Sequence, residues 1–197
     1  MREFSEHSAW YRFKEGDVEA LSFLYEHYVN KLFAYGIKIH PDDSLVKDCI
    51  QDVFIQLIDK KQSLQITENT HLYLFKALRN KLFEELRTQN RKTLINQTIQ
   101  LDANSFEQSA EQSIVLSEEE KYRKELMEKA LNALNDYQRE AIFLKYSQGF
   151  SYDQIAVLLD IEVASARTLI YRILKNVKEN ISGKIQIFFC LFRSRFT

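Results

Sequence analysis

Hydrophobic positions in the first half of the chain repeat at helical spacing. Apolar residues recur every three or four positions over residues 17–39, which predicts an amphipathic helix. Pro41 ends that pattern, and a second helix is predicted to begin at Asp42, because acidic groups stabilise a helix N-terminus. The apolar stripe predicted for this second helix is Leu45, Val46, Cys49, Ile50, Val53, Leu57 and Ile58. A third helix is predicted over residues 71–87, where the apolar positions repeat every four residues at Leu74, Leu78, Leu82 and Leu86.

A second run of helical periodicity covers residues 130–180. Helical packing is predicted at its start for Ala130, Leu131, Leu134, Tyr137, Ala141, Ile142 and Leu144. It pauses at the sequence S-Q-G, where Gly149 suits the left-handed end of a helix. Ser151 and Gln154 then have the spacing of a capping box, which predicts a short helix over residues 152–159. A turn at residues 160–162 leads to a further helix from Val163, so this pattern predicts a helix-turn-helix.

Composition and charge support an all-α fold of two small helical domains. The 197 residues include one Pro and four Gly, too few for many strands joined by tight turns. The net charge of −1 conceals an uneven distribution: residues 1–92 are neutral, residues 93–120 carry six acidic and no basic groups, and residues 121–197 carry a net +5. We therefore expect residues 93–120 to be an acidic flexible linker, with a polar surface helix as the alternative.

Cysteine usage and the N-terminus bear on the location of the protein. Cys49 and Cys190 lie far apart, and the N-terminus lacks the apolar core of a signal peptide. No segment approaches the ~20 consecutive apolar residues of a membrane span. We expect a cytoplasmic protein with reduced thiols and without stable membrane insertion, in which Cys49 is buried in an apolar stripe.

Two predicted helices carry faces suited to nucleic acid. On the third helix, cations lie beside an amide and an aromatic ring, which fits single-stranded DNA, although solvated surface alone explains such a face. On the last helix, hydroxyl groups and long cations lie opposite the stripe Ala166, Leu169, Ile170, Ile173 and Val177. These groups suit phosphates and base edges, whereas a plain helical bundle with a tight turn is the alternative.

Together these features resemble the extracytoplasmic-function (ECF) sigma factors of bacterial RNA polymerase. The segment V-K-D-C-I-Q-D-V-F-I-Q-L resembles the core-binding helix of sigma region two, and Y-L-F-K-A-L-R-N-K-L-F-E-E-L-R resembles the helix after it. The segment L-N-A-L-N-D-Y-Q-R-E-A-I-F-L-K-Y-S-Q-G-F-S-Y-D-Q-I-A-V-L-L resembles region four. The resemblance implies region two at residues 1–92 and region four at residues 121–181.

The resemblance implies a sigma factor that binds core RNA polymerase and directs promoter recognition, melting and transcription initiation, controlled by an anti-sigma factor. It implies core-polymerase contacts at Asp48, Gln51, Asp52 and Phe54. It implies contacts to the minus-ten element at Lys76, Arg79, Asn80, Phe83 and Arg87, and to the minus-thirty-five element at Ser151, Ser165, Arg167, Thr168, Tyr171, Arg172 and Lys175. No enzyme activity, cofactor or metal site is expected, because the histidines lack ligand spacing and no Gly-rich phosphate loop is present.

The chain also departs from the family pattern. Leu72 stands where the family often has Trp, Asn135 lies near a common Pro position, and Asp160 stands where the turn often has Gly. The recognition helix opens with V-A-S-A in place of Pro-Gly-Thr-Val, so the promoter sequence does not follow from the family. The form A-R-T-L-I-Y-R resembles Bacteroidetes members. A stand-alone helix-turn-helix regulator, which dimerises and binds DNA without polymerase, is the alternative function.

Residues 182–197 form an apolar tail that does not fit region four. Three roles are open for it: a helix folded back on one domain, a docking surface for an anti-sigma factor or the linker, and contact with a membrane surface. The tail is too short to span a membrane.

Overall fold

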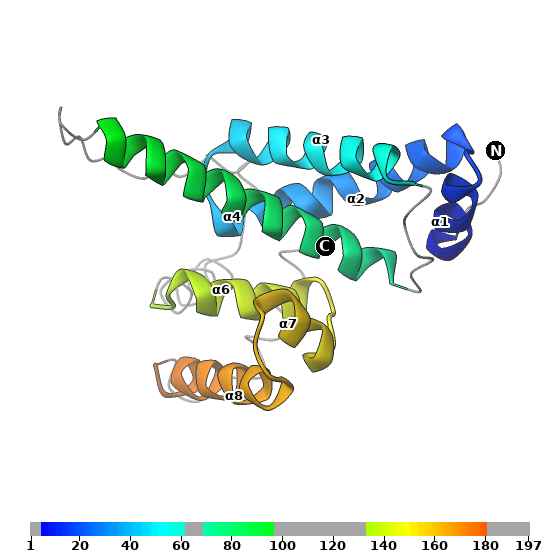
Figure 1. The fold of residues 1–197 in the computed structure, drawn as a ribbon. Helices are drawn as coiled ribbons and strands as arrows, with labels where there is room; N and C mark the ends of the chain where they lie inside the picture. The colour runs from blue at the N-terminus through cyan, green and yellow to red at the C-terminus, as the bar shows by residue number, and fades with distance from the viewer. Residues whose placement is uncertain (1–4, 62–68, 97–132, 181–197) are drawn as a thin grey trace, which may run out of the picture.

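The computed structural model describes residues 5–61, 69–96 and 133–180, and every regular element within these ranges is helical (Figure 1). The all-α prediction is therefore confirmed for this part of the chain. Most of the predicted acidic linker and the whole apolar tail lie outside the described residues. No helix in the described ranges is long and apolar enough to cross a membrane.

The first domain, residues 5–96, opens with two helices joined by a tight turn. α1 spans Glu6–Lys14 and is capped by Ser5, whose Oγ accepts a hydrogen bond from the backbone N–H of Ser8. α2 spans Val18–Ile39 and is capped by Asp17, in agreement with the predicted helix. α1 was not predicted, because it is too short for a clear period, yet it buries Ala9, Trp10 and Phe13.

Two further helices complete the first domain by packing on α2 and on each other. α3 spans Asp43–Asp59 behind the cap at Asp42, and α4 spans Thr70–Asn96, so α4 continues beyond the expected end at residue 87. The predicted leucines of α4 form the centre of the core except Leu86, which is half-buried, and Cys49 is buried as expected. α2 and α3 approach so closely that a Cβ at Gly36 would lie 2.4 Å from Cγ1 of Val46.

The second domain, residues 133–180, contains the predicted helix-turn-helix. α6 spans Asp136–Ile142, η1 is a π-helical turn at Phe143–Ser147, α7 spans Tyr152–Leu159 and α8 spans Val163–Asn180. The predicted periodicity ran across residue 135, but Asn135 caps α6 in a capping box with Gln138 and so starts a new helix there. Gly149 has a positive φ of 73°, as expected for the residue after a helix end.

The turn before α8 is made by a residue in the left-handed conformation. Asp160 has φ 57° and ψ 50°, and its backbone N–H bonds to the carbonyl oxygen of Ala156. Asp tolerates this region better than most residues because its short polar side chain can bond locally. The loss of the family's glycine at this position therefore leaves the turn intact.

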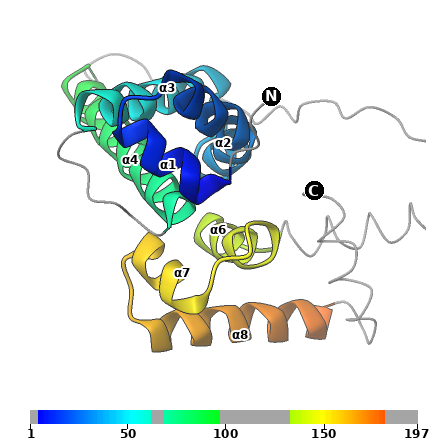
Figure 2. The same cartoon turned by 90° about the vertical axis from the view of Figure 1, so that its right-hand side faces the viewer.

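The two domains pack against each other. α6 lies against α2, and α7 lies against α4. Figure 2 shows α6 and α7 between the first domain and α8, which is the element farthest from the first domain. This arrangement buries one side of the second domain, and among the described residues those on the outer side of α8 are exposed.

Candidate functional site

The outer face of α8 is an exposed surface of hydroxyls, cations and one tyrosine. Ala166, Ile170, Ile173 and Val177 are buried, which fixes the opposite face toward solvent; Leu169, expected in the same stripe, is half-buried. All of the predicted recognition residues on this helix are exposed: Ser165, Arg167, Thr168, Tyr171, Arg172 and Lys175. Among the described aromatic residues, Tyr171 has the largest exposed fraction, 67%. We call these six residues the recognition surface.

Ser151, which was predicted to contact DNA, also caps the N-terminus of α7. Its Oγ accepts a hydrogen bond of 3.2 Å from the backbone N–H of Gln154, and the Gln154 side chain accepts one of 2.8 Å from the backbone N–H of Ser151. This reciprocal cap holds the start of α7. Next to it, the guanidinium of Arg167 lies 5.7 Å from the ring centroid of Tyr152, which links α7 to the recognition surface.

The exposed side of α3 combines acidic, amide and apolar groups. Asp48 and Gln51 are exposed, whereas Asp52 forms an ion pair of 3.0 Å with Lys81 on α4. Hydrogen bonds to Glu85 and Asp52 raise the pKa of Lys81 and keep it charged. Phe54 is only 6% exposed, and its ring lies edge-on to Tyr25 of α2, with centroids 5.0 Å apart.

The apolar part of this surface was not predicted from the sequence. Tyr25, Ile55 and Ile58 are 44–46% exposed, and Ile58 was wrongly placed in the buried stripe of its helix. Phe54, Tyr25 and Ile58 line a groove of about 290 Å³ between α2 and α3. α3 has more apolar residues than one face of a helix can bury. This excess is the one sequence signal that could have indicated such a groove.

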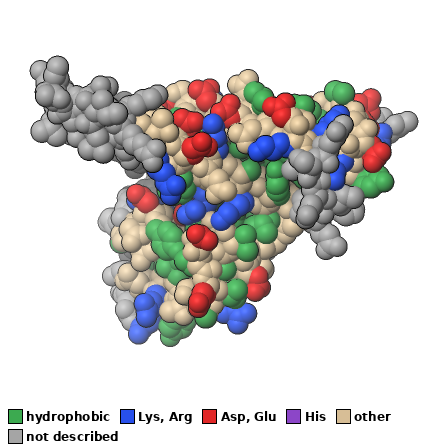
Figure 3. Space-filling model, viewed as in Figure 1, with side chains coloured by type: hydrophobic (Ala, Val, Ile, Leu, Met, Phe, Trp, Pro, Cys, Tyr) green, Lys and Arg blue, Asp and Glu red, His purple; other side chains and the backbone are tan. Residues whose placement is uncertain are grey.

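α4 carries the predicted minus-ten residues, which we call the minus-ten surface: Lys76, Arg79, Asn80, Phe83 and Arg87. Asn80 and Arg87 are exposed, and Phe83 is half-buried beneath the guanidinium of Arg79 at 4.6 Å. The other two members point toward the second domain. Figure 3 shows Lys and Arg side chains gathered where the two domains meet.

Arg79 reaches a buried carboxylate of the second domain. Its Nε donates a hydrogen bond of 2.9 Å to Oε1 of Glu140, and the hydroxyl of Tyr35 donates one of 2.7 Å to the same oxygen. The side chains of Arg79 and Glu140 are 13% and 6% exposed. Burial and the neighbouring Glu140 carboxylate raise the pKa of Tyr35 well above its usual value. We call Tyr35, Arg79 and Glu140 the Glu140 cluster; Tyr35 and Glu140 were not predicted from the sequence as site residues.

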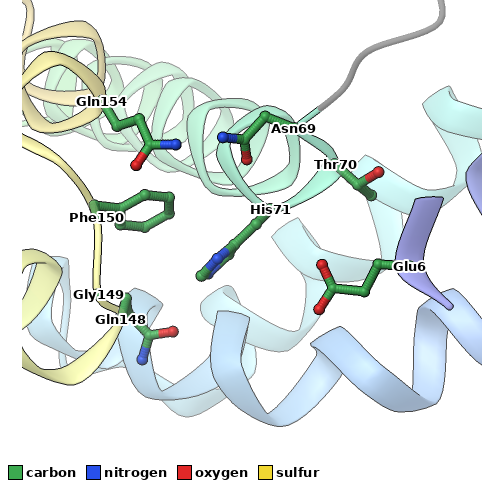
Figure 4. A pocket seen from close by; sticks show the side chains of 8 residues that line it. All are labelled: Glu6, Asn69, Thr70, His71, Gln148, Gly149, Phe150 and Gln154. Atoms are coloured by element: carbon green, nitrogen blue, oxygen red, sulfur yellow. The ribbon is translucent and has the colours of Figure 1, made fainter.

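Aromatic rings meet beside the Glu140 cluster. The ring of Phe150 lies 4.3 Å from that of His71 and 5.3 Å from that of Phe75, centroid to centroid. We call these three residues the ring cluster. Burial lowers the pKa of His71 to about 4, so the ring is neutral at physiological pH. A polar pocket of about 340 Å³ opens beside Phe150 and His71, lined by both domains (Figure 4).

Comparisons with known proteins cover both domains. The sigma-70 region 2 family model matches residues 24–92, and the sigma-70 region 4 model matches residues 124–177. The ECF RNA polymerase sigma-E factor of Escherichia coli K12 is 25% identical over 182 residues, which cover 89% of this chain and 91% of that protein. The protein of the same name from Haemophilus influenzae is 24% identical over 179 residues, with 89% and 92% coverage.

Two solved structures have the same fold. One is the sigma factor RpoE from Bartonella quintana in complex with the anti-sigma factor NepR, with a TM-score of 0.62, 22% identity, and coverage of 85% of this chain and 99% of that chain. The other is CnrH in complex with the cytosolic domain of CnrY, with a TM-score of 0.58, 16% identity, and coverage of 91% and 98%. With a region two domain, a region four helix-turn-helix and relatives along most of its length, the chain belongs to the ECF sigma factors of RNA polymerase.

Proposed function

We propose that this non-enzymatic sigma factor divides its contacts among three surfaces. Core polymerase binds α3 through Asp48, Gln51 and Asp52, while the exposed groove around Tyr25 and Ile58 takes apolar side chains of the same partner. Phe54 is a positioning residue, because its buried ring supports the exposed ring of Tyr25. The minus-ten surface holds the unstacked strand of the promoter, with cations on phosphates and Phe83 against a base.

The single observation that carries this proposal is the exposed recognition surface of α8. Its buried stripe fixes the helix in the second domain, and its exposed face presents cations, hydroxyls and Tyr171. An α-helix fits the major groove, where such groups reach phosphates and base edges. We propose that α8 reads the minus-thirty-five element in this way, with Ser151 at the start of α7 contacting the DNA backbone.

Control by an anti-sigma factor is part of the proposal. One solved structure with this fold, the sigma factor RpoE from Bartonella quintana, is in complex with the anti-sigma factor NepR. The sequence form A-R-T-L-I-Y-R supports a Bacteroidetes origin. A cytoplasmic location follows from the proposed action of the protein on promoter DNA with bacterial RNA polymerase. Matches to both region two and region four favour this function over a stand-alone helix-turn-helix regulator.

Transcription in vitro with bacterial core polymerase on a library of promoter fragments tests the proposal. The wild-type chain is expected to yield discrete, sigma-dependent transcripts. Arg172→Ala is expected to lower them about tenfold, because one good base contact is worth about 1–3 kcal/mol. Asp48→Ala with Gln51→Ala is expected to weaken binding to core polymerase without changing the start sites.

Arg139→Ala is the matched control for a lost cation. Arg139 lies on α6 and pairs with Asp136 at the surface, away from the recognition surface. This variant is expected to transcribe like the wild type. Absence of transcripts with every core polymerase tried would overturn the polymerase role, and an equal loss in Arg139→Ala and Arg172→Ala would overturn the assignment of α8.

A further inference from the structure

Resting on the proposed polymerase contact at the groove between α2 and α3, we propose that a second copy of this chain uses the same groove, by inserting its apolar C-terminal residues 185–196. Two chains exchange these segments reciprocally and form a dimer. The dimer covers a surface that core polymerase needs, so dimerisation and polymerase binding compete.

The groove between α2 and α3 combines apolar side chains with carboxylates. It is lined by Leu21, Ser22, Tyr25, Glu26, Phe54 and Ile58. The rings of Tyr25 and Phe54 meet edge-on at 5.0 Å, and Tyr25 and Ile58 keep nearly half of their surface exposed. The next residue along each helix, Glu26 and Asp59, is an exposed carboxylate. Such a surface fits a helix that carries both apolar anchors and cations.

The sequence of residues 181–197 has the complementary pattern, with three basic and no acidic residues. At 3.6 residues per turn, five large apolar side chains of this segment fall within about 100° of one another. We call these five residues the tail stripe: Ile185, Phe188, Phe189, Phe192 and Phe196. Arg193 falls on one side of the stripe, and Lys184 and Arg195 fall on the other. Anchors at this spacing are typical of helices that bind apolar grooves.

The position of α8 explains why the groove takes the segment of a second copy. α8 packs on α6, α6 on α2 and α2 on α3, and Figure 2 shows α3 and α8 at opposite ends of this stack. Three packed pairs at 8–10 Å each separate α8 from α3 by about 24–30 Å. The five steps from Asn180, the last residue of α8, to Ile185 span at most about 18 Å. A helical tail stripe therefore does not reach the groove of its own chain, whereas a second chain has no such limit.

A reciprocal exchange uses every groove and every tail stripe. Each chain has one of each, so a two-fold arrangement satisfies both pairs and ends at two chains. A one-way exchange would instead continue from chain to chain. The second contact is also favoured once the first has formed, because it is then made within one complex.

The exchange competes with polymerase at the first domain. The tail stripe lies between Tyr25 and Ile58, which is the place proposed for apolar side chains of core polymerase. A chain in the dimer therefore cannot offer this groove to polymerase. By mass action, a high concentration of free sigma factor favours the dimer, and an excess of core polymerase returns it to monomers.

Sedimentation equilibrium of the full chain at micromolar concentrations measures the exchange. The wild-type chain is expected to dimerise. Phe189→Ser with Phe192→Ser is expected to raise the dissociation constant at least about tenfold, because two apolar anchors are lost. Ile187→Ser with Leu191→Ser is the matched control: it removes two apolar side chains outside the tail stripe and leaves the dissociation constant unchanged. A monomeric wild type, or equal losses in both double variants, would overturn the proposal.

Variants of the groove test where the tail stripe binds. Ile58→Ser is expected to weaken the dimer at least about tenfold. Val157→Ser on α7 is its matched control, because Val157 is similarly exposed, 51% against 45% for Ile58. Higher salt is also expected to weaken the dimer, since exposed ion pairs with Glu26 and Asp59 are screened. A wild-type dissociation constant for Ile58→Ser would overturn the assignment of the groove, and a dimer insensitive to salt would overturn the role of the carboxylates.

A synthetic peptide of residues 181–197 with an N-terminal fluorescein tests the contact between separate molecules. Anisotropy measures its binding to the full chain that carries Phe189→Ser with Phe192→Ser, whose groove is unoccupied in the proposal. We expect this chain to bind the peptide, and we expect added Ile58→Ser or an excess of core polymerase to abolish binding. Absence of peptide binding would overturn the exchange.

Failure of the proposed function has a different signature. If the dimer forms as expected but core polymerase does not displace the peptide, the polymerase contact at the groove is wrong and the exchange stands. If the wild-type chain directs transcription but stays monomeric, the exchange is wrong and the proposed function stands.

Discussion

The hydroxyl of Tyr35 donates a hydrogen bond of 2.7 Å to Oε1 of Glu140, across the boundary between two domains and 105 positions along the chain. Both groups are buried, and Glu140 also holds Arg79. A buried carboxylate needs such partners, because an unpaired buried charge costs several kcal/mol. This contact therefore links the packing of the domains to the state of the minus-ten surface.

Replacement of the Tyr35 hydroxyl is predicted to shift the chain toward separated domains. Tyr35→Phe keeps the ring that stacks on Phe75 at 4.9 Å but removes one hydrogen bond to a charged acceptor. We expect the packed arrangement of the two domains to lose about 1.5–3 kcal/mol relative to separated domains. Energy transfer between dyes at Asn30→Cys in α2 and Ala164→Cys in α8 measures this shift. Equal closure in Tyr35→Phe and wild type would contradict the prediction.

Acidification is predicted to open the domains through His71. Its pKa is about 4 in the closed chain, chiefly because of burial; Lys31 and His27 also lower it, while Glu6 and Gln148 raise it. An exposed histidine has a pKa of about 6.5. Between these two values the open state binds more protons, so closure weakens as pH falls through 6.5 toward 4 and is unaffected above that range.

A pH titration of domain closure checks this prediction. We expect about a tenfold shift toward the open state between pH 7 and pH 5, since part of the burial of His71 comes from the second domain. His71→Phe keeps a ring in the ring cluster but cannot accept a proton. An unaltered pH profile in this variant would assign the effect to another group.

Gly36→Ala is predicted to destabilise the first domain by about 1–3 kcal/mol, because overpacking in a core costs about that much. Its Cβ would lie 2.4 Å from Cγ1 and 3.2 Å from Cγ2 of Val46. Denaturant unfolding measures the loss. Val46→Ala in the same chain is expected to restore part of it, because the two clashing methyl groups are gone. Additive losses in the double variant would show that the two residues do not interact.

Asp160→Gly is predicted to stabilise the second domain by about 0.5 kcal/mol. The backbone at Asp160 is left-handed, and glycine takes this conformation without steric cost. Asp160→Ala is expected to lower stability, since alanine has neither the freedom of glycine nor a polar group that bonds locally. Thermal unfolding of the three chains should therefore rank Gly above Asp and Asp above Ala.

Local sequence signals predicted most of the helix boundaries. Asp17, Asp42 and Ser151 cap the helices that their positions indicated, and Gly149 takes the left-handed conformation. These features depend on neighbours within a few residues, so the chain alone specifies them. α1 and the break at Asn135 were missed: one helix is too short for a period, and the other starts where the helical spacing of apolar residues continues across residue 135.

Burial at the surfaces was predicted less well. Ile58 and Tyr137 were expected to pack inside, yet they are 45% and 39% exposed. Phe54 matched the polymerase-binding pattern, yet its ring is buried against Tyr25. Periodicity tells which residues share one side of a helix, but the width of the buried stripe depends on what packs against it.

The sequence by itself determined most of the helices and their caps, the two charged faces and the family. Only the tertiary structure decided which members of the minus-ten surface are covered. Arg79 and Glu140 are 61 positions apart, and Lys76 and Val157 are 81 positions apart. No local pattern links such residues, because their contact follows from how the two domains pack and not from helix period or capping. Packing thus leaves the polar face of α8 exposed, whereas on α4 it covers Lys76 and Arg79 and leaves Asn80 and Arg87 exposed.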